Sequence, residues 1–415
     1  MKNSLNSLFA RGISILSKFF LIMFLIKVLP LSEYGTFQLI SYFILMSIYI
    51  YGLEYYMYSN RDIANKEDIE QKINNHISFF ITLFPLTFSI QIVAMYFLLP
   101  LENVSFVILF MIFFISFSEY FSQEIYRYLI MLEKVLEANS LLIVKSLLFL
   151  VLLIGYFEVT KSLDLFSILI IMSMSYFILI LISLYYLFSI FLSFDKINYS
   201  IFSLTKLKQI FKILRPFIIL MLFMKGLEYF DKFFISYLYG VKLLGIYAFF
   251  ISIAMLVHIF TISGFYIIYL PKLIQRYEEK NYLFKKEFFK FSLLTILSTL
   301  IVSICIVIFI NPLLSLLGKE ELKNYIDLLY ILLISLSFLN LSLIPNLLLY
   351  IAGKEEDLMW ITGGLLLINI GLNIMFMNYF TINGVAIALG ITYLLSIFFK
   401  YRKGKEIWIK EIKTF

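Results

Sequence analysis

The sequence predicts an all-α integral membrane protein whose helices form two six-helix lobes. Of its 415 residues, 62% are hydrophobic, 19% are aromatic and 15% are charged, whereas soluble domains are roughly 45–50% apolar and roughly 25% charged. The apolar residues form uninterrupted stretches of membrane-spanning length, and a repeat relates the two halves of the chain. These three observations together predict a multi-pass helical fold.

Twelve apolar stretches are each long enough to span a membrane, which takes about 20 residues. They lie near residues 5–29, 36–58, 77–98, 104–121, 139–158, 164–193, 216–239, 246–269, 289–310, 326–350, 358–379 and 383–399. Twelve helices use about 240 residues, so the remaining chain leaves no room for an appended soluble catalytic domain. We therefore expect a protein that is not an enzyme.

The distribution of Lys and Arg predicts the orientation. With the N-terminus in the cytoplasm, 24 of the 34 basic residues face inward and five face outward, as the positive-inside rule requires. Both termini are therefore expected inside, and the net charge of +7 is a topology signal, not a sign of nucleic-acid binding. The longest inner connection suggests an N-terminal lobe at 1–193, a cytoplasmic linker at 194–213 and a C-terminal lobe at 214–415 with a short basic tail.

An internal repeat supports the division into six plus six helices. Three segments recur in order: Arg11–Phe20 over Lys225–Phe234, Tyr34–Phe37 over Leu244–Tyr247, and Leu129–Lys134 over Leu349–Lys354. Because six is even, both lobes enter the membrane from the same side, as in transporters built from parallel repeats. We expect the substrate to bind in a central cavity between the lobes.

Four basic residues inside the predicted spans are candidates for substrate binding. Arg11 and Lys18 are seven residues apart and share one face of the first helix, and Lys225 and Lys232 repeat that spacing in the second lobe. A cation in hydrocarbon costs at least about 2.5–3.5 kcal/mol, so it faces a partner or a wet cavity. A cationic cavity would suit an anionic headgroup such as a diphosphate.

Glu228 and Asp231 lie beside the lysines of the second lobe and leave two interpretations open. They could only neutralise Lys225 and Lys232, or one of them could bind a coupling ion, H⁺ or Na⁺, while the cavity keeps a net charge of +2. His258 could carry a coupling proton, or it could be a neutral histidine packed between helices.

The other polar residues in the spans carry weaker predictions. Asn369 and Asn373 share a helix face at i, i+4 and could bond between helices or line the cavity. Glu54, Glu119 and Lys145 lie near the predicted cytoplasmic helix ends, which favours interfacial anchoring over cavity lining. One cysteine and two histidines make a metal site improbable, and no cofactor is expected.

Several short motifs resemble the polysaccharide-biosynthesis flippases, of O-antigen and capsule type, within the multidrug/oligosaccharidyl-lipid/polysaccharide (MOP) exporter superfamily. They are Leu31–Phe37, Asp231–Ile235, Leu244–Ala248, Leu270–Lys272, Ala352–Lys354, Asn369 with Asn373, and Asn383–Ala388. The resemblance implies a fold like that of the MATE exporters. It also implies alternating-access flipping of an undecaprenyl-diphosphate-linked oligosaccharide across the bacterial inner membrane.

Three alternatives stay open beside the flippase. A cation-coupled multidrug exporter would share the fold, but it would prefer an anionic cavity. A membrane polysaccharide polymerase or ligase would need an outer catalytic site, for which the connections are short. A purely structural membrane protein would not need cations repeated inside both lobes.

Overall fold

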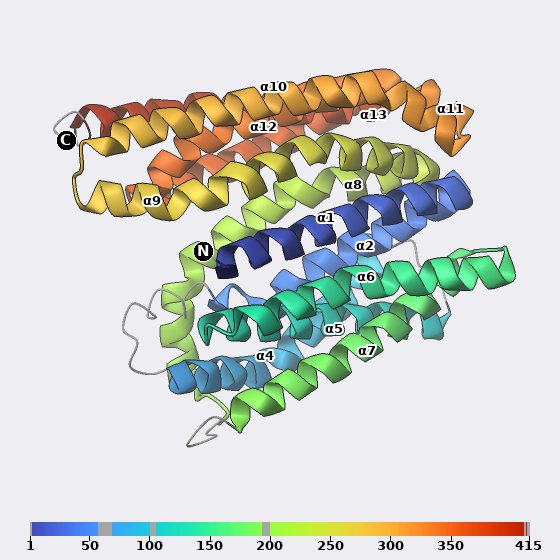
Figure 1. Ribbon diagram of the computed structural model, residues 1–415, viewed down its shortest axis with the longest axis horizontal. Helices are drawn as coiled ribbons and strands as arrows, with labels where there is room; N and C mark the ends of the chain where they lie inside the picture. The colour runs from blue at the N-terminus through green and yellow to red at the C-terminus, as the bar shows by residue number, and fades with distance from the viewer. Residues whose placement is uncertain (1, 57–68, 100–104, 193–199, 411, 413–415) are drawn as a thin grey trace. The chain divides into compact units, whose positions relative to one another are not determined.

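The computed structural model describes all residues except 1, 57–68, 100–104, 193–199, 411 and 413–415 (Figure 1). For residues 2–8, 11, 69 and 410 it describes the backbone and not the side chain. The described residues are almost all helical and contain no β-strand. The chain divides into two compact units, unit 1 (Met1–Met221) and unit 2 (Leu222–Phe415). The all-α prediction is therefore confirmed.

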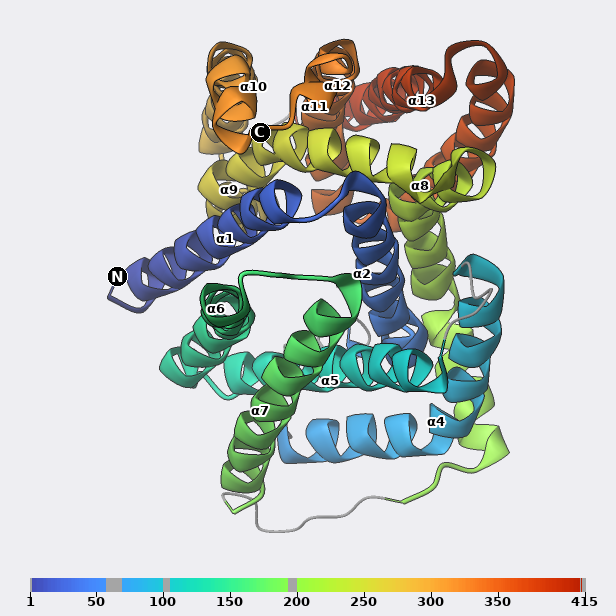
Figure 2. The same cartoon turned by 90° about the vertical axis from the view of Figure 1, so that its right-hand side faces the viewer.

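Unit 1 is a bundle of long helices. Its members are α1 (Lys2–Val28), α2 (Leu31–Gly52), α4 (Ile69–Leu98), α5 (Phe106–Met131), α6 (Val135–Thr160), α7 (Leu165–Phe191) and the beginning of α8 (Leu204–Thr261). Within the bundle, α5, α6 and α7 pack on one another, α2 packs against α4 and α5, and α1 packs along α6 (Figure 2). This packing brings polar side chains of α1, α5, α6 and α7 within reach of each other.

Unit 2 contains the rest of α8 and the helices that follow. These are the π-helical turn η3 (Ile262–Tyr266), α9 (Ile267–Glu278), α10 (Leu283–Leu317), α11 (Glu320–Lys323), α12 (Ile326–Ile351) and α13 (Glu355–Lys410). Both α8 and α13 consist of two helices joined at a sharp kink. The kinks lie at Gly240 (φ 81°) and Thr381 (φ 51°, ψ −131°). Glycine adopts a positive φ without strain, whereas a β-branched residue such as threonine adopts it only under strain.

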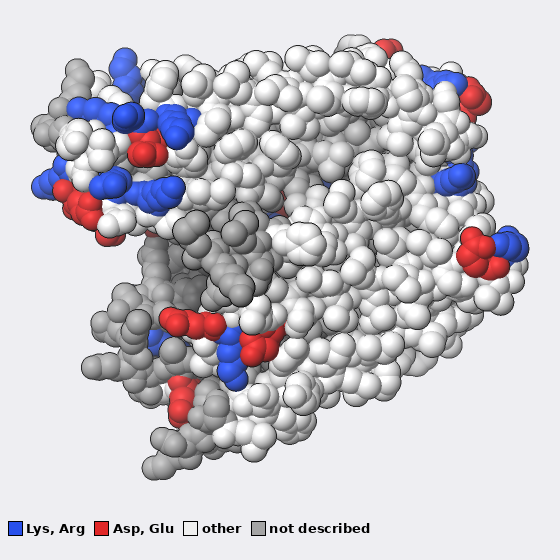
Figure 3. All heavy atoms as spheres, viewed as in Figure 1, with Lys and Arg blue, Asp and Glu red and all other residues white. Residues whose placement is uncertain are grey.

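The surface of the helices is that of a membrane protein. Nine helices of the described residues are long and apolar enough to cross a bilayer, and two of these ranges include the kinks at Gly240 and Thr381. Along α10, apolar side chains such as Leu300, Ile304 and Ile308 are exposed. On the face drawn in Figure 3, charged side chains gather at the helix ends and leave an uncharged stretch between them. The chain is a multi-pass membrane protein; the count of twelve helices stays a prediction.

One segment of the predicted repeat has a structural counterpart. The helix α5 ends with the Lys134 amide donating to the Leu129 carbonyl at 2.8 Å, and α12 ends with the Lys354 amide donating to the Leu349 carbonyl at 3.0 Å. The residue before each lysine, Glu133 or Gly353, has a positive φ. The two helices thus end in the same way 220 residues apart.

The predicted linker does not stand apart from the bundles. Residues 193–199 lie outside the described residues, but the amide of Ser200 donates to Ser78 Oγ at 3.1 Å and that of Phe202 to Thr82 Oγ1 at 3.0 Å. From Leu204 onward the chain is helical, and its apolar side chains pack on α4. The two compact units divide further along α8, between residues 221 and 222.

Candidate functional site

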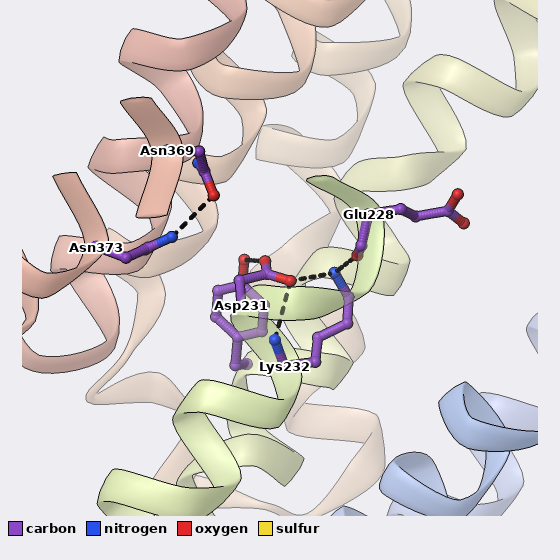
Figure 4. A network of polar contacts seen from close by, with 6 residues as sticks. Glu228, Asp231, Lys232, Asn369 and Asn373 are labelled. Carbon is purple, nitrogen blue, oxygen red and sulfur yellow. Dashed lines mark hydrogen bonds and ion pairs between the residues drawn. The ribbon is translucent and has the colours of Figure 1, made fainter. Parts of the chain in front are cut away.

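In unit 2, four charged side chains of α8 form two ion pairs, and Figure 4 draws the one between Asp231 and Lys232. Lys225 Nζ lies 2.5 Å from Glu228 Oε2, and Lys232 Nζ lies 2.9 Å from Asp231 Oδ1. Lys232 Nζ also donates to the backbone carbonyl of Glu228, and the Tyr247 hydroxyl donates to Asp231 Oδ2 at 2.6 Å. These four charges sum to zero.

The two pairs differ sharply in burial. Asp231 and Lys232 are 1% and 6% exposed, whereas the side chain of Glu228 is 40% exposed. A buried charge needs a hydrogen-bonded partner because its hydration is lost. For Asp231 these partners are Lys232 and the Tyr247 hydroxyl. The Lys225–Glu228 pair follows from the i, i+3 spacing on one helix face, and it stays accessible.

Two asparagines of α13 form a directed chain of hydrogen bonds in the same unit (Figure 4). Asn373 Nδ2 donates to Asn369 Oδ1 at 2.9 Å, and Asn369 Nδ2 donates to Thr392 Oγ1 at 3.1 Å, which donates to the Ala388 carbonyl. The buried Oδ1 of Asn373 accepts no hydrogen bond within the described residues. Tyr393, next to Thr392, interacts electrostatically with the α8 acids. The asparagine chain therefore lies close to the charged group.

The remaining candidate in unit 2, His258, is half-buried near the end of α8. Its Nδ1 lies 2.7 Å from Oδ1 of Asn340 on α12. The amide nitrogen of Asn340 donates to the Val257 carbonyl, Thr261 Oγ1 and Thr299 Oγ1 at 3.2, 3.1 and 3.0 Å. The histidine is thus held by a network that joins α8, α10 and α12.

Unit 1 contains a second charge cluster, formed by four helices. Near the middle of α5, Glu119 accepts from Lys145 Nζ of α6 at 2.6 Å and from the Tyr176 hydroxyl of α7 at 2.7 Å. Lys18 of α1 is exposed and interacts electrostatically with both Lys145 and Glu119. Two cations share one carboxylate, so this cluster has a net charge of +1. The fourth predicted cation, Arg11, has its side chain outside the described residues.

Within the described residues, no three His, Cys, Asp or Glu side chains come together as they would in a metal site. The clusters are therefore ion pairs and hydrogen-bond networks inside two helical bundles. Such arrangements can bind small ions or the charged part of a ligand, since intramembrane ionisable residues usually mark transport pathways.

Comparison with solved structures shows which fold carries these clusters. A multidrug resistance MATE family transporter of the MOP superfamily, in an inward-facing conformation, superposes with a TM-score of 0.74 at 16% identity, covering 98% of this chain and 99% of that chain. The fold is that of a MATE transporter. The lipid II flippase MurJ shares it, with a TM-score of 0.70 at 14% identity and coverage of 99% and 90%. A MOP superfamily transporter from Pyrococcus furiosus also shares it, with a TM-score of 0.64 at 16% identity, covering 97% of this chain and 94% of that chain.

Sequence comparison agrees with the MATE fold over part of the chain. The sequence profile of the family described as MatE matches residues 216–375, which include the α8 charges, His258 and both asparagines. A search of curated proteins finds no match. The predicted fold class is confirmed.

Sequence reasoning missed the ion pair between Glu119 and Lys145. The apolar stretch predicted at 104–121 put Glu119 near a cytoplasmic helix end, but α5 continues to Met131. Glu119 is 6% exposed and paired with Lys145, so its side chain lies inside the helix bundle of unit 1. A signal was present, because an acid and a lysine in adjacent hydrophobic spans are natural ion-pair partners. Glu54, in contrast, does lie beyond the end of α2.

Proposed function

We propose that this MATE-fold protein is a flippase that moves an undecaprenyl-diphosphate-linked oligosaccharide, an O-antigen or capsule repeat unit, across the bacterial inner membrane by alternating access. Both termini would lie in the cytoplasm. The fold supports a transporter, and one of the proteins that share it is a lipid II flippase. The identity of the substrate rests on the charges inside the membrane.

The observation that carries the proposal is the net positive cluster of unit 1. Lys18 and Lys145 share a single carboxylate, Glu119, and Lys18 is exposed. An excess cation in the middle of a membrane helix is costly unless an anion compensates it. A diphosphate supplies several charged oxygens to which an ammonium group donates strong hydrogen bonds. Lys18, together with Arg11, is our proposed headgroup contact in this unit.

In unit 2 we propose that the lysines contact the substrate and that other residues bind a coupling ion. Lys225 is the more accessible of the two lysines, since its side chain is 20% exposed and that of Lys232 is 7% exposed. A diphosphate could compete with Glu228 for Lys225. Lys232 is buried, so it would contact the substrate only if its pair with Asp231 opened. Glu228, Asp231 and His258 are the candidates for binding a coupling ion.

Asn369 and Asn373 are proposed to line the transport pathway. The buried Oδ1 of Asn373 accepts no hydrogen bond from the residues that the structure describes. This supports the role, because a buried acceptor without a donor costs free energy that a hydroxyl group of the glycan would recover.

Flipping in proteoliposomes tests the proposal. A fluorescent undecaprenyl-diphosphate oligosaccharide is placed in both leaflets, and its accessibility to an added glycosidase is followed over time. We expect transport by the wild-type protein, a strong loss in Lys18→Ala, and normal transport in Lys161→Ala. Lys161 is a suitable control because it is exposed and lies at the end of α6 in the same unit. No flipping by a well-folded wild-type protein would refute the proposal.

A cation-coupled multidrug exporter is the second candidate. The match of residues 216–375 to the MatE family and the nearly buried carboxylate of Asp231 favour it. The same proteoliposomes decide between the two functions. Ion-gradient-driven uptake of a lipophilic cationic dye without flipping of the lipid-linked oligosaccharide would favour the exporter.

A further inference from the structure

The side chain of Asn340 can be oriented without ambiguity from its neighbours. The Val257 carbonyl, 3.2 Å away, can only accept a hydrogen bond. The Thr299 hydroxyl donates its one proton to the Thr295 carbonyl at 2.7 Å, so towards Asn340 it can only accept as well. Both neighbours require the NH₂ group of Asn340. The carbonyl oxygen Oδ1 must therefore face the opposite side, where His258 lies.

This orientation fixes the tautomer of His258. An amide oxygen has no proton to give, and it lies 2.7 Å from His258 Nδ1, so Nδ1 must carry a hydrogen. We propose that His258 is the proton-binding residue of unit 2 and that Asn340 is its positioning residue, which holds the ring as the Nδ1–H tautomer and leaves Nε2 to take up and release the proton. The inference rests on the proposed transport function only in calling this proton the coupling ion.

Among the described residues, the hydrogen-bond network that holds His258 contains no other group that titrates. The network consists of the Asn340 amide and of the hydroxyl groups of Thr261, Ser298 and Thr299, none of which titrates. The charged group that acts on the ring is Glu228, on the earlier part of α8, and Glu228 pairs with Lys225. Proton uptake at Nε2 thus places a new positive charge in the field of a half-exposed carboxylate.

Protonation changes the charge of the whole polar group of unit 2. The four α8 charges sum to zero, and an imidazolium at His258 raises the sum to +1. The site also directly precedes the π-helical turn Ile262–Tyr266, and π-turns inside α-helices are frequent at functional sites. A proton bound here is therefore placed to act both on an anionic substrate and on the shape of α8.

Nitrogen NMR of the histidine ring tests the assignment without any substrate. The chain has two histidines, so His76→Gln leaves His258 as the only signal. In ¹⁵N-histidine-labelled protein in detergent, the neutral ring should show Nδ1 protonated and Nε2 bare, the opposite of the tautomer that free imidazole side chains prefer. As the pH is lowered into the acidic range, Nε2 should move to the protonated shift while Nδ1 stays protonated.

The variant Asn340→Leu should remove the preference of His258 for the Nδ1–H tautomer, so that the neutral ring shifts to the Nε2–H tautomer. Asn378→Leu, at an exposed asparagine of α13, should leave the tautomer of His258 unchanged. If Asn340→Leu does not fold, the His76→Gln spectrum alone decides. An Nε2–H tautomer in that spectrum, or a ring that never titrates in folded protein, overturns the proposal.

Flipping assays separate this inference from the proposed function. In wild-type proteoliposomes a pH gradient should drive transport, and His258→Gln should lose that dependence. If flipping responds to a sodium gradient and ignores pH, the proton assignment fails while the flippase stands. If no oligosaccharide is flipped but the predicted tautomer and titration are observed, the flippase fails while the proton site stands.

Discussion

The buried ion pair of α8 yields the sharpest stability prediction, because the same helix supplies its own control. Lys232→Met removes the partner of Asp231, a carboxylate that is 1% exposed. Lys225→Met removes the partner of Glu228, whose side chain is 40% exposed. The two substitutions are chemically identical, so any difference between them reports burial.

The expected magnitudes follow from the geometry. Breaking a buried pair by removing one partner costs about 3–5 kcal/mol, and the bond from Tyr247 to Asp231, at 2.6 Å, keeps Lys232→Met near the lower value. For a unit of this size that corresponds to a decrease in Tm of roughly 6–12 °C. Water solvates Glu228 in the other variant, so Lys225→Met should cost about 1 kcal/mol or less. The double variant Asp231→Asn/Lys232→Met should recover most of the loss, with a coupling energy of roughly 0.5–3 kcal/mol.

Thermal unfolding of purified protein in detergent measures these differences, followed by light scattering or intrinsic fluorescence. Equal losses in Lys232→Met and Lys225→Met would refute the reasoning, because burial would then not control the cost. A double variant no more stable than Lys232→Met would refute it as well, since Asp231 would not be the stranded charge.

Two further predictions test the packing and the topology. A Cβ at Gly384 would lie 2.4 Å from the Phe376 carbonyl oxygen, whereas one at Gly371 meets nothing within 4 Å. Gly384→Ala should therefore lower the Tm clearly, while Gly371→Ala should leave it unchanged or raise it slightly. Equal effects on the Tm would contradict the packing. In a cysteine-free background, a membrane-impermeant thiol reagent added outside intact cells should label a cysteine at Glu320 and not one at Lys280, and the reverse pattern would overturn the predicted orientation.

The fold was predictable because each membrane-spanning helix is marked in the sequence by its own run of apolar residues. Twenty apolar residues in a row leave the backbone no alternative to a helix in hydrocarbon, and the predicted boundaries at 239 and 379 come within two residues of the kinks at Gly240 and Thr381. The helix ends were less predictable. Polar residues such as Gln123 and Glu124 continue α5 to Met131, since polar residues end an apolar stretch without ending the helix.

The site was predictable in its residues and not in its partners. Lys225 and Glu228 are three residues apart in the sequence and form a pair in the structure, because one helix fixes both positions. Contacts between helices depend on which faces meet, and a single sequence does not encode that explicitly. The partners of Lys18 on α5 and α6, and Asn340 beside His258, therefore became visible only in the structure.

The central claim is that an excess cation in unit 1 binds the diphosphate of a lipid-linked substrate, and a binding measurement tests it most directly. The dissociation constants of purified protein for undecaprenyl diphosphate and undecaprenyl monophosphate are compared for wild type, Lys18→Ala and Lys161→Ala. A lost charge-assisted hydrogen bond is worth about 1.5–3 kcal/mol, so Lys18→Ala should bind the diphosphate roughly 10- to 100-fold more weakly. Lys161→Ala should bind it as tightly as wild type, and wild type should bind the diphosphate more tightly than the monophosphate. Equal affinities of wild type and Lys18→Ala for the diphosphate would contradict the claim.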